Sequence, residues 1–169
     1  MSKVIRLADK RVRIEDDGWT LLREPGLEIA NDADLIVPLA DWLARAETFR
    51  ARSGKTGVWI APAEDPKALQ GHFDGLALVA VEFPKFNDGR GYSSARLIIE
   101  RYHYEGEVRA VGDVLADQIP LMRRCGINAF VVTHGPTRKA LEAGALATVN
   151  VFYQPVGTTE VPVGTRPFL

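Results

Sequence analysis

The chain has 169 residues, of which 46% are hydrophobic and 25% are charged, as expected for one soluble globular domain. Its 21 Lys and Arg residues nearly balance 22 Asp and Glu residues, so the net charge of −1 provides no attraction to nucleic acid or to an anionic membrane. The single cysteine, Cys125, excludes a disulfide framework, and we identify neither a signal peptide nor an apolar run long enough to span a bilayer. We therefore expect a cytoplasmic protein that binds neither nucleic acid nor membrane.

The N-terminal region predicts a short β-hairpin cap. Two short stretches, residues 4–7 and 11–14, are followed by Asp16-Asp17-Gly18 and then by the apolar run 19–22. An Asp-Gly pair between such runs favours a tight turn. We therefore expect short antiparallel strands around this turn.

From Asp34 onward, short apolar runs alternate with stretches of helical periodicity. The predicted strands are residues 35–37, 57–60, 76–83, 108–111, 129–132 and 149–153. The predicted helices are residues 39–51, 66–73, 92–102, 115–124 and 137–146. Consecutive apolar residues indicate strands buried on both faces, and their alternation with helices indicates βαβ units. We predict an α/β fold with a mainly parallel sheet, either an open sheet or an incomplete TIM-like barrel.

These patterns together indicate a single domain over residues 1–169. It comprises an N-terminal β cap (1–33), an α/β core (34–153) and a C-terminal tail (154–169). Three prolines and two glycines in the tail predict an extended segment, either loose or draped over a neighbouring molecule.

The loop between the predicted strand 76–83 and the predicted helix 92–102 is the main candidate site. Ligands of α/β sheets and barrels bind where the carboxyl ends of the strands meet, and this loop is longer than the usual connection of about 4–6 residues. Free backbone N–H groups at the start of the helix, with two arginines nearby in sequence, favour an anion pocket. The predicted ligand-binding residues are Lys85, Asp88, Gly89, Arg90, Gly91, Ser93, Arg96 and, from the following helix on the same rim, Gln118.

Asp113 and His134 are the two catalytic candidates, because each follows a predicted strand at this rim. Asp113 could instead be a helix N-cap, and His134 a solvated loop residue. The loop also has a structural interpretation, since Asn-Asp-Gly at 87–89 is a common turn and Arg96 has Glu100 four residues later as an ordinary surface partner.

Two partial motifs bear on cofactors. Ser-Gly-Lys-Thr at 53–56 is similar to the end of a P-loop, but Phe49 stands where the first glycine is needed and the segment leads from a helix into a strand. The pattern GxGxxS at 89–94 follows a strand and precedes a helix, so a dinucleotide site is retained as an alternative. No cofactor is evident, no metal-ligand cluster is present in the sequence, and a nicotinamide or a flavin is an alternative only.

Three segments carry a resemblance to a known family. They are FPxFxDGRGYSxAR at 83–96, RAVGDVLxDQ at 109–118 and RCG at 124–126. The chain resembles the bacterial domain-of-unknown-function 934 family, which is labelled an oxidoreductase involved in sulfite reduction. Members are typically encoded beside sulfite reductase and adenylyl-sulfate or phosphoadenylyl-sulfate reductase. The resemblance implies a role in assimilatory sulfate and sulfite reduction, and it implies no catalytic residues.

Electron transfer requires a carrier, and one cysteine can neither hold an iron–sulfur cluster alone nor form an internal dithiol. We therefore expect an accessory protein that binds a small oxyanion or one of those sulfur-assimilation enzymes. The alternative is an oxidoreductase of sulfite reduction with a bound nicotinamide or flavin. The oligomeric state stays open, a homo-oligomer included.

Overall fold

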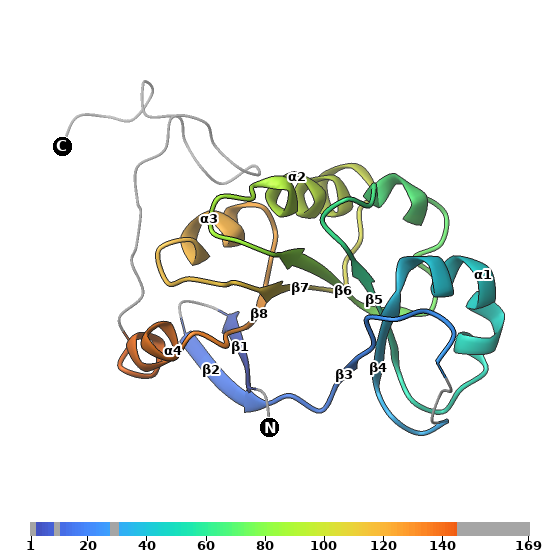
Figure 1. Ribbon diagram of the computed structural model, residues 1–169, viewed down its shortest axis with the longest axis horizontal. Coiled ribbons are helices and arrows are strands. Elements are labelled where there is room, and N and C mark those ends of the chain that lie inside the picture. Colours follow the sequence, from blue (N-terminus) through green and yellow to red (C-terminus); the bar gives the residue numbers. More distant parts are fainter. Residues whose placement is uncertain (1–2, 9–10, 28–30, 145–169) are drawn as a thin grey trace.

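The computed structural model describes residues 3–8, 11–27 and 31–144. Eight strands form one open, curled sheet in the order β2-β1-β8-β7-β6-β5-β4-β3, which gives the molecule the form of a half-barrel (Figure 1). The strands are β1 (Lys3–Ala8), β2 (Arg11–Asp16), β3 (Thr20–Leu21), β4 (Leu35–Pro38), β5 (Thr56–Ile60), β6 (Leu76–Phe83), β7 (Glu107–Gly112) and β8 (Ala129–Val131). The helices are α1 (Leu39–Arg50), the 3-10 helix η1 (Pro66–Leu69), α2 (Arg90–Arg96), the π-helix η2 (Leu97–Arg101), α3 (Ile119–Arg124) and α4 (Gly135–Glu142).

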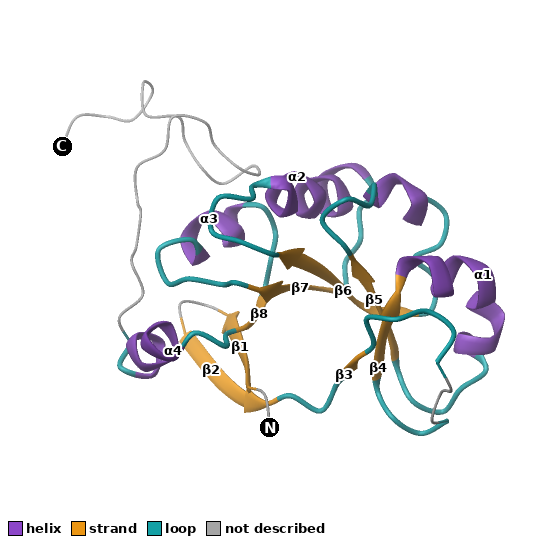
Figure 2. Cartoon of the chain, viewed as in Figure 1, coloured by secondary structure: helices purple, strands orange, loops and turns teal. Residues whose placement is uncertain are grey.

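The parallel core confirms the α/β prediction. Strands β4 to β8 lie side by side in chain order, and every neighbouring pair among them is parallel. This is the arrangement that successive right-handed βαβ units produce. The segments after β4, β5, β6 and β7 cover the outer face of the curl, as Figure 2 shows with helices on one side of the strands.

The main hydrophobic core lies between that outer face and the helices. Val79, Val81 and Phe83 of β6 point into it, together with Trp42 of α1 and Ile98 of η2. A smaller apolar cluster lies on the inner face of the sheet and is formed by Ile36, Leu78, Ala80 and Val111. Both faces of the central strands are therefore partly apolar, which explains the continuous hydrophobic runs in their sequences.

The N-terminal prediction is right in part. β1 and β2 do pair antiparallel, and β1 extends the sheet by pairing antiparallel with β8. The turn expected at Asp17-Gly18 is wrong, because β3 pairs in parallel with β4 at the opposite edge of the sheet. The chain from β2 to β3 thus runs from one edge of the described sheet to the other.

Several predicted helices are shorter in the structure. Only a 3-10 turn forms within 66–73. Helix α3 begins after Gln118, with Pro120 in its first turn, and ends at Arg124, two residues before Gly126, which has a φ of +93°. Proline favours a helix start and a glycine with positive φ favours its end. The predicted strand 149–153 and the tail 154–169 lie outside the described residues. Within the described part of the chain, no helix is long and apolar enough to cross a membrane.

Candidate functional site

The carboxyl ends of β6 and β7 bring two of the predicted site segments together. Phe83 and Gly112 are partners in the parallel ladder, and the Asp113 amide donates to the Phe83 carbonyl over 2.6 Å. Beyond them, the Gln118 side-chain amide donates to the Phe86 carbonyl over 3.1 Å. The loop before α2, residues 84–89, is therefore joined to the segment 113–118, and we call this pair of segments the rim loops.

Two glycines let the rim loops approach each other and the sheet. Gly112 has a φ of +96°, and a Cβ atom there would overlap the Phe83 carbonyl oxygen. A Cβ atom on Gly91 would lie 2.7 Å from the Phe83 ring, which itself packs edge-on against Tyr92 with centroids 5.1 Å apart. Close packing against Phe83 thus explains why residue 91 is a glycine. The dinucleotide pattern would explain the same glycine by the close approach of a pyrophosphate.

Arg90, the residue predicted to carry the main positive charge, has an internal counter-ion. Its guanidinium binds Asp88 through two contacts, Nε to Oδ1 at 3.0 Å and Nη2 to Oδ2 at 2.6 Å. The Arg90 amide also donates to Asp88 Oδ1, over 3.2 Å. These hydrogen bonds lower the pKa of Asp88 from 3.8 to about 2. The predicted anion site thus has its leading cation already bound to a carboxylate.

The exposed part of this loop is aromatic and basic. Phe86 is 60% exposed although its carbonyl is held by Gln118. Lys85 beside it is exposed, and its side-chain ammonium has no hydrogen bond or ion pair to a described residue. Gln118 is itself buried. The loop therefore presents a large apolar ring on a fixed backbone.

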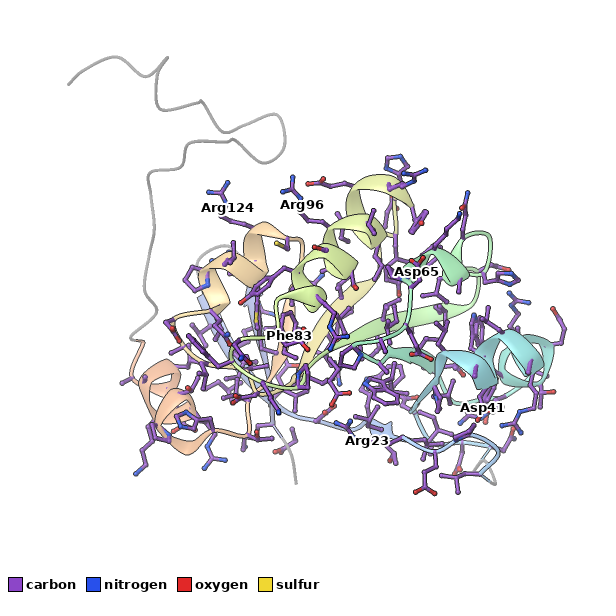
Figure 3. All side chains as sticks on the ribbon, turned by 45° about the horizontal axis from the view of Figure 1, so that its top comes forward. Arg23, Asp41, Asp65, Phe83, Arg96 and Arg124 are labelled. Atoms are coloured by element: carbon purple, nitrogen blue, oxygen red, sulfur yellow. The ribbon has the colours of Figure 1, made fainter. Side chains whose placement is uncertain are left out.

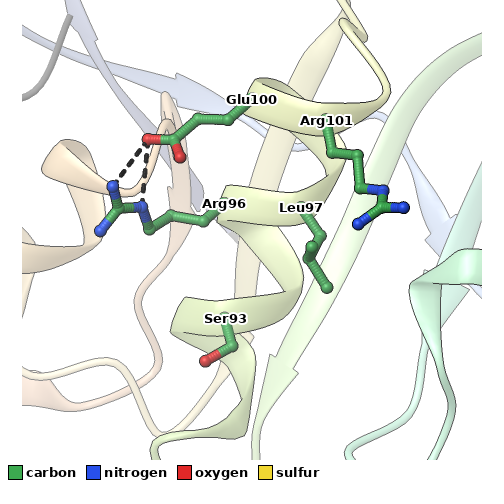
Figure 4. A pocket seen from close by; sticks show the side chains of 5 residues that line it. All are labelled: Ser93, Arg96, Leu97, Glu100 and Arg101. Atoms are coloured by element: carbon green, nitrogen blue, oxygen red, sulfur yellow. Dashed lines mark hydrogen bonds and ion pairs between the residues drawn. The ribbon is translucent and has the colours of Figure 1, made fainter.

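Ser93 and Arg96 lie elsewhere, on the outer surface of the helix that continues from α2 into η2 (Figure 4). They line a shallow depression of about 590 Å³ together with Leu97, Glu100 and Arg101. Arg96 Nε donates to Glu100 Oε1 over 3.0 Å, which is the surface pair that the sequence allowed. Gly89 precedes α2 and supplies no side-chain cap. The predicted ligand residues thus divide between the rim loops and an outer helix surface.

The two catalytic candidates have different surroundings. Asp113 is half-buried, and its carboxylate has no hydrogen bond or ion pair to any residue in the described ranges. His134 caps α4, since its Nδ1 lies 2.9 Å from the Thr137 hydroxyl and accepts from the Thr137 amide over 3.4 Å. A structural role thus explains His134, while the Asp113 carboxylate has no such explanation.

The inner face of the half-barrel carries a charged network that the sequence interpretation missed. Arg109, fully buried, binds Asp17 (Nη1 to Oδ1, 2.9 Å) and Glu107 (Nη2 to Oε1, 2.6 Å), and it lies 5.7 Å from the Trp19 ring. Glu107 also binds Arg6 on β1, which pairs with Glu15 on β2. Strands β2, β1 and β7 are thus linked by one chain of alternating charges.

A second inner-face group lies near the carboxyl ends of the strands. Arg23, labelled in Figure 3, extends over the Trp59 ring at 5.1 Å and reaches Glu82 on β6 at 2.7 Å. The buried Trp59 indole N–H has no hydrogen-bond partner in the described part of the protein. The signal for both groups was the presence of Glu82, Glu107 and Arg109 inside otherwise apolar strands, at alternate positions that share one face.

Metal binding and thiol reactivity are two further kinds of chemistry to consider for the described residues. Among them, no three His, Cys, Asp or Glu side chains are grouped so that they could hold a metal ion. Burial raises the pKa of the Cys125 thiol, which disfavours the nucleophilic thiolate.

A curled, mainly parallel sheet with helices on its outer face and rim loops joined to each other defines an α/β half-barrel protein. The family model described as bacterial protein of unknown function (DUF934) matches residues 57–164, and the chain belongs to this family. A comparison with curated proteins finds no match to the chain.

Proposed function

We propose that this protein is an accessory protein of sulfite reduction that binds a partner enzyme through the rim loops. The observation that carries the proposal is the exposed ring of Phe86 on a loop whose backbone is already fixed. Large aromatic side chains dominate the energetics of protein interfaces when they enter a pocket of the partner.

The fixed geometry of the loop favours such binding. The Gln118 side chain donates a hydrogen bond to the Phe86 carbonyl, and Asp88 forms an ion pair with Arg90. Gly91 lets α2 start directly against the Phe83 ring. A loop that is ordered before binding loses little conformational entropy on association, so more of the contact energy is available for affinity. Exposed Lys85 and Arg90 lie on either side of Phe86 in the sequence and supply charge at the rim of such an interface.

A small oxyanion at the same loop is a weaker candidate. The oxyanion would compete with Asp88 for the guanidinium of Arg90, and the low pKa of Asp88 reflects how strongly that carboxylate is held in its charged form. Lys85 is left as the exposed cation without a partner among the described residues of the loop. Protein recognition requires no such displacement, since Phe86 is already exposed.

The pathway is inferred from the family. The resemblance set out above associates the family with sulfite reductase and with adenylyl-sulfate or phosphoadenylyl-sulfate reductase, so these enzymes are the partners to test. The oxidoreductase alternative would require a bound carrier, and the purified protein would then be coloured or would consume a reduced nicotinamide in the presence of sulfite.

The test is a binding titration by biolayer interferometry with immobilised protein and the purified reductases of the same organism. Phe86→Ala should weaken the complex by about 30-fold or more, as expected for an aromatic anchor. Leu43→Ala is the matched control, because Leu43 is also an exposed apolar residue, 38% exposed, and lies on α1. The proposal is wrong if neither reductase binds, or if Phe86→Ala binds as tightly as Leu43→Ala.

A further inference from the structure

The strand β2 ends the described sheet on one side. It pairs with β1 along its whole length, from Arg11 to Asp16, and no described strand pairs with its other edge. An edge of six residues presents backbone N–H and C=O groups that can bind a further strand. The opposite end of the sheet is β3, which has only two residues. Within the described sheet, the edge of β2 is therefore the longer place for strand addition.

The parallel core fixes the direction in which the chain continues after β8. Each strand from β5 to β8 lies beside the previous one, always on the same side, and the connecting segments cover the outer face (Figure 2). Nearly all such parallel crossovers are right-handed. A strand that follows α4 should therefore run parallel to β8 and lie on the side of β8 away from β7. The nearest two positions on that side are filled by β1 and β2.

Helix α4 lies where such a crossover would lead. It follows β8 in the chain and contacts β2, which is two strands farther along the sheet (Figure 1). Leu141 of α4 is buried in the main core, against which Val12 and Ile14 of β2 also pack. The chain has thus already crossed the width of β1 and β2 when α4 ends at Glu142.

The sequence after α4 contains a segment suited to this edge. Residues 149–153, Val-Asn-Val-Phe-Tyr, form the strand predicted from the sequence and lie outside the described residues. Such β-branched and aromatic residues favour strands, and Pro155 follows shortly after them. Six residues, 143–148, separate α4 from this segment, which matches the usual length of about 2–6 residues for a helix-to-strand connection. Composition and position in the chain therefore both suit a strand beside β2.

We propose that residues 149–153 bind the free edge of β2 in the same chain. Strand β1 is antiparallel to both β2 and β8, so β2 runs parallel to β8. The added strand is therefore parallel to β2. The alternation of side chains along a strand places its two valines on one face, where they continue the outer apolar surface formed by Val12 and Ile14.

This addition changes the opening of the half-barrel. The added strand lies on the open side, between the edge strands β2 and β3, so it narrows the gap between them. Because it is parallel to the core strands, its carboxyl end lies at the same rim as those of β6 and β7. The inference uses only the sheet and the chain that follows α4, so it does not depend on the proposed function.

Hydrogen exchange measured by NMR on the full-length protein tests the pairing. The β2 amides that point away from β1 should exchange slowly in the wild type, because they donate to the added strand. Val151→Pro removes a backbone donor from that strand and should speed their exchange by about 10-fold or more. Thr158→Pro, the same kind of change outside the predicted strand, should leave their exchange unchanged. The amides of β6 report whether the core of each variant is still folded.

A spin label tests the position of the segment without changing its backbone. The nitroxide is attached to Asn150→Cys in a Cys125→Ala background, so that only one thiol is present. This label should broaden the amide signals of β2. A label at Gln70→Cys, an exposed position directly after η1, should leave those signals unchanged. A mixture of 15N-labelled protein and unlabelled, spin-labelled protein distinguishes the same chain from a second copy, since broadening should then disappear.

Three outcomes overturn the inference. The first is wild-type exchange of these β2 amides at the rate of fully exposed amides, and the second is an equal effect of Val151→Pro and Thr158→Pro. The third is broadening of β2 that persists undiminished in the mixture, because a second copy would then supply the strand. If Val151→Pro also speeds exchange in β6, the spin label decides, and sharp β2 signals with the label at residue 150 would overturn the inference.

Discussion

Arg109 and Asp17 form an ion pair whose side chains are both almost completely buried, at 0% and 6% exposure. The pair joins a central strand to the segment that leads to the opposite edge of the sheet. A buried charge that loses its partner is far more costly than the pair is favourable. This contact therefore fixes the position of the segment between β2 and β3, which runs from one edge of the sheet to the other.

The first prediction follows from that contact. Asp17→Asn should lower the free energy of unfolding by about 2–3 kcal/mol, less than a full loss of the partner because Glu107 still binds Arg109. Urea unfolding measures the change. Asp16→Asn is the control, because Asp16 is 65% exposed in its pair with Lys3 and should cost less than about 1 kcal/mol. Equal costs for the two variants would contradict the prediction.

The second prediction separates backbone conformation from steric overlap at the rim. Gly112→Ala should destabilise the protein by about 3 kcal/mol, because a positive φ and an overlap with the Phe83 carbonyl act together. Gly26→Ala should cost only about 1 kcal/mol, since Gly26 has a φ of +79° but open space around its Cβ position. Thermal unfolding of both variants tests this, and similar costs would show that the close approach at Gly112 is unimportant.

The third prediction concerns the rigidity of the loop. Gln118→Ala removes the donor to the Phe86 carbonyl, so trypsin should cleave after Lys85 about 5-fold faster, as expected for the loss of about 1 kcal/mol from local stability. Gln70→Ala, at an exposed position, should leave this rate unchanged. Mass spectrometry of the products at early times identifies the cleavage site. An unchanged rate in Gln118→Ala would mean that the loop is fixed by other contacts.

The fourth prediction is a pH dependence of the Asp88–Arg90 pair. The pKa of Asp88 is lowered from 3.8 to about 2, so the contribution of the pair is complete above pH 3.8 and is lost as the pH falls through about 2. NMR titration of the Asp88 carboxyl carbon should give a pKa of about 2 in the wild type. In Arg90→Ala that pKa should return toward 3.8. A wild-type value near 3.8 would show that the pair does not persist in solution.

The fifth prediction is physiological and follows from the family resemblance. A strain lacking the gene should grow poorly on sulfate or sulfite but normally on cysteine. Complementation with the Phe86→Ala variant should fail if the rim loops bind the partner, whereas the Leu43→Ala variant should restore growth. Normal growth of the deletion strain on sulfate, with no second copy of the gene, would contradict a role in this pathway.

The parallel core was predictable because it is encoded locally. Each strand from β4 to β8 contains a cluster of apolar residues and is followed by a helical or turn segment, and β6 has the same bounds in the prediction and in the structure. The neighbourhood of Phe83 and Asp113 also follows from a general rule, since parallel strands place their carboxyl ends at one rim.

The position of β3 was not predictable in the same way. The Asp-Gly pair is a local signal for a turn, but the Asp17 carboxylate binds Arg109 at a sequence separation of 92 residues. The buried charged network was missed for a related reason. Strands with several apolar residues were interpreted as apolar on both faces, so their charged residues were not assigned to a buried face. At the candidate site, the Asp88–Arg90 pair was within reach of sequence reasoning, since the two residues are only two positions apart.

The place of β1 in the sheet has a consequence for how the chain folds. Among the strands of the described sheet, β1 is the first to be synthesised and its partner β8 is the last. Contacts between such distant segments require closure of a large loop and form slowly. The edge of β1 that pairs with β8 must therefore wait until β8 has been synthesised, even where β1 has already paired with β2. During that interval the backbone N–H and C=O groups along this edge are unpaired and open to association with other chains.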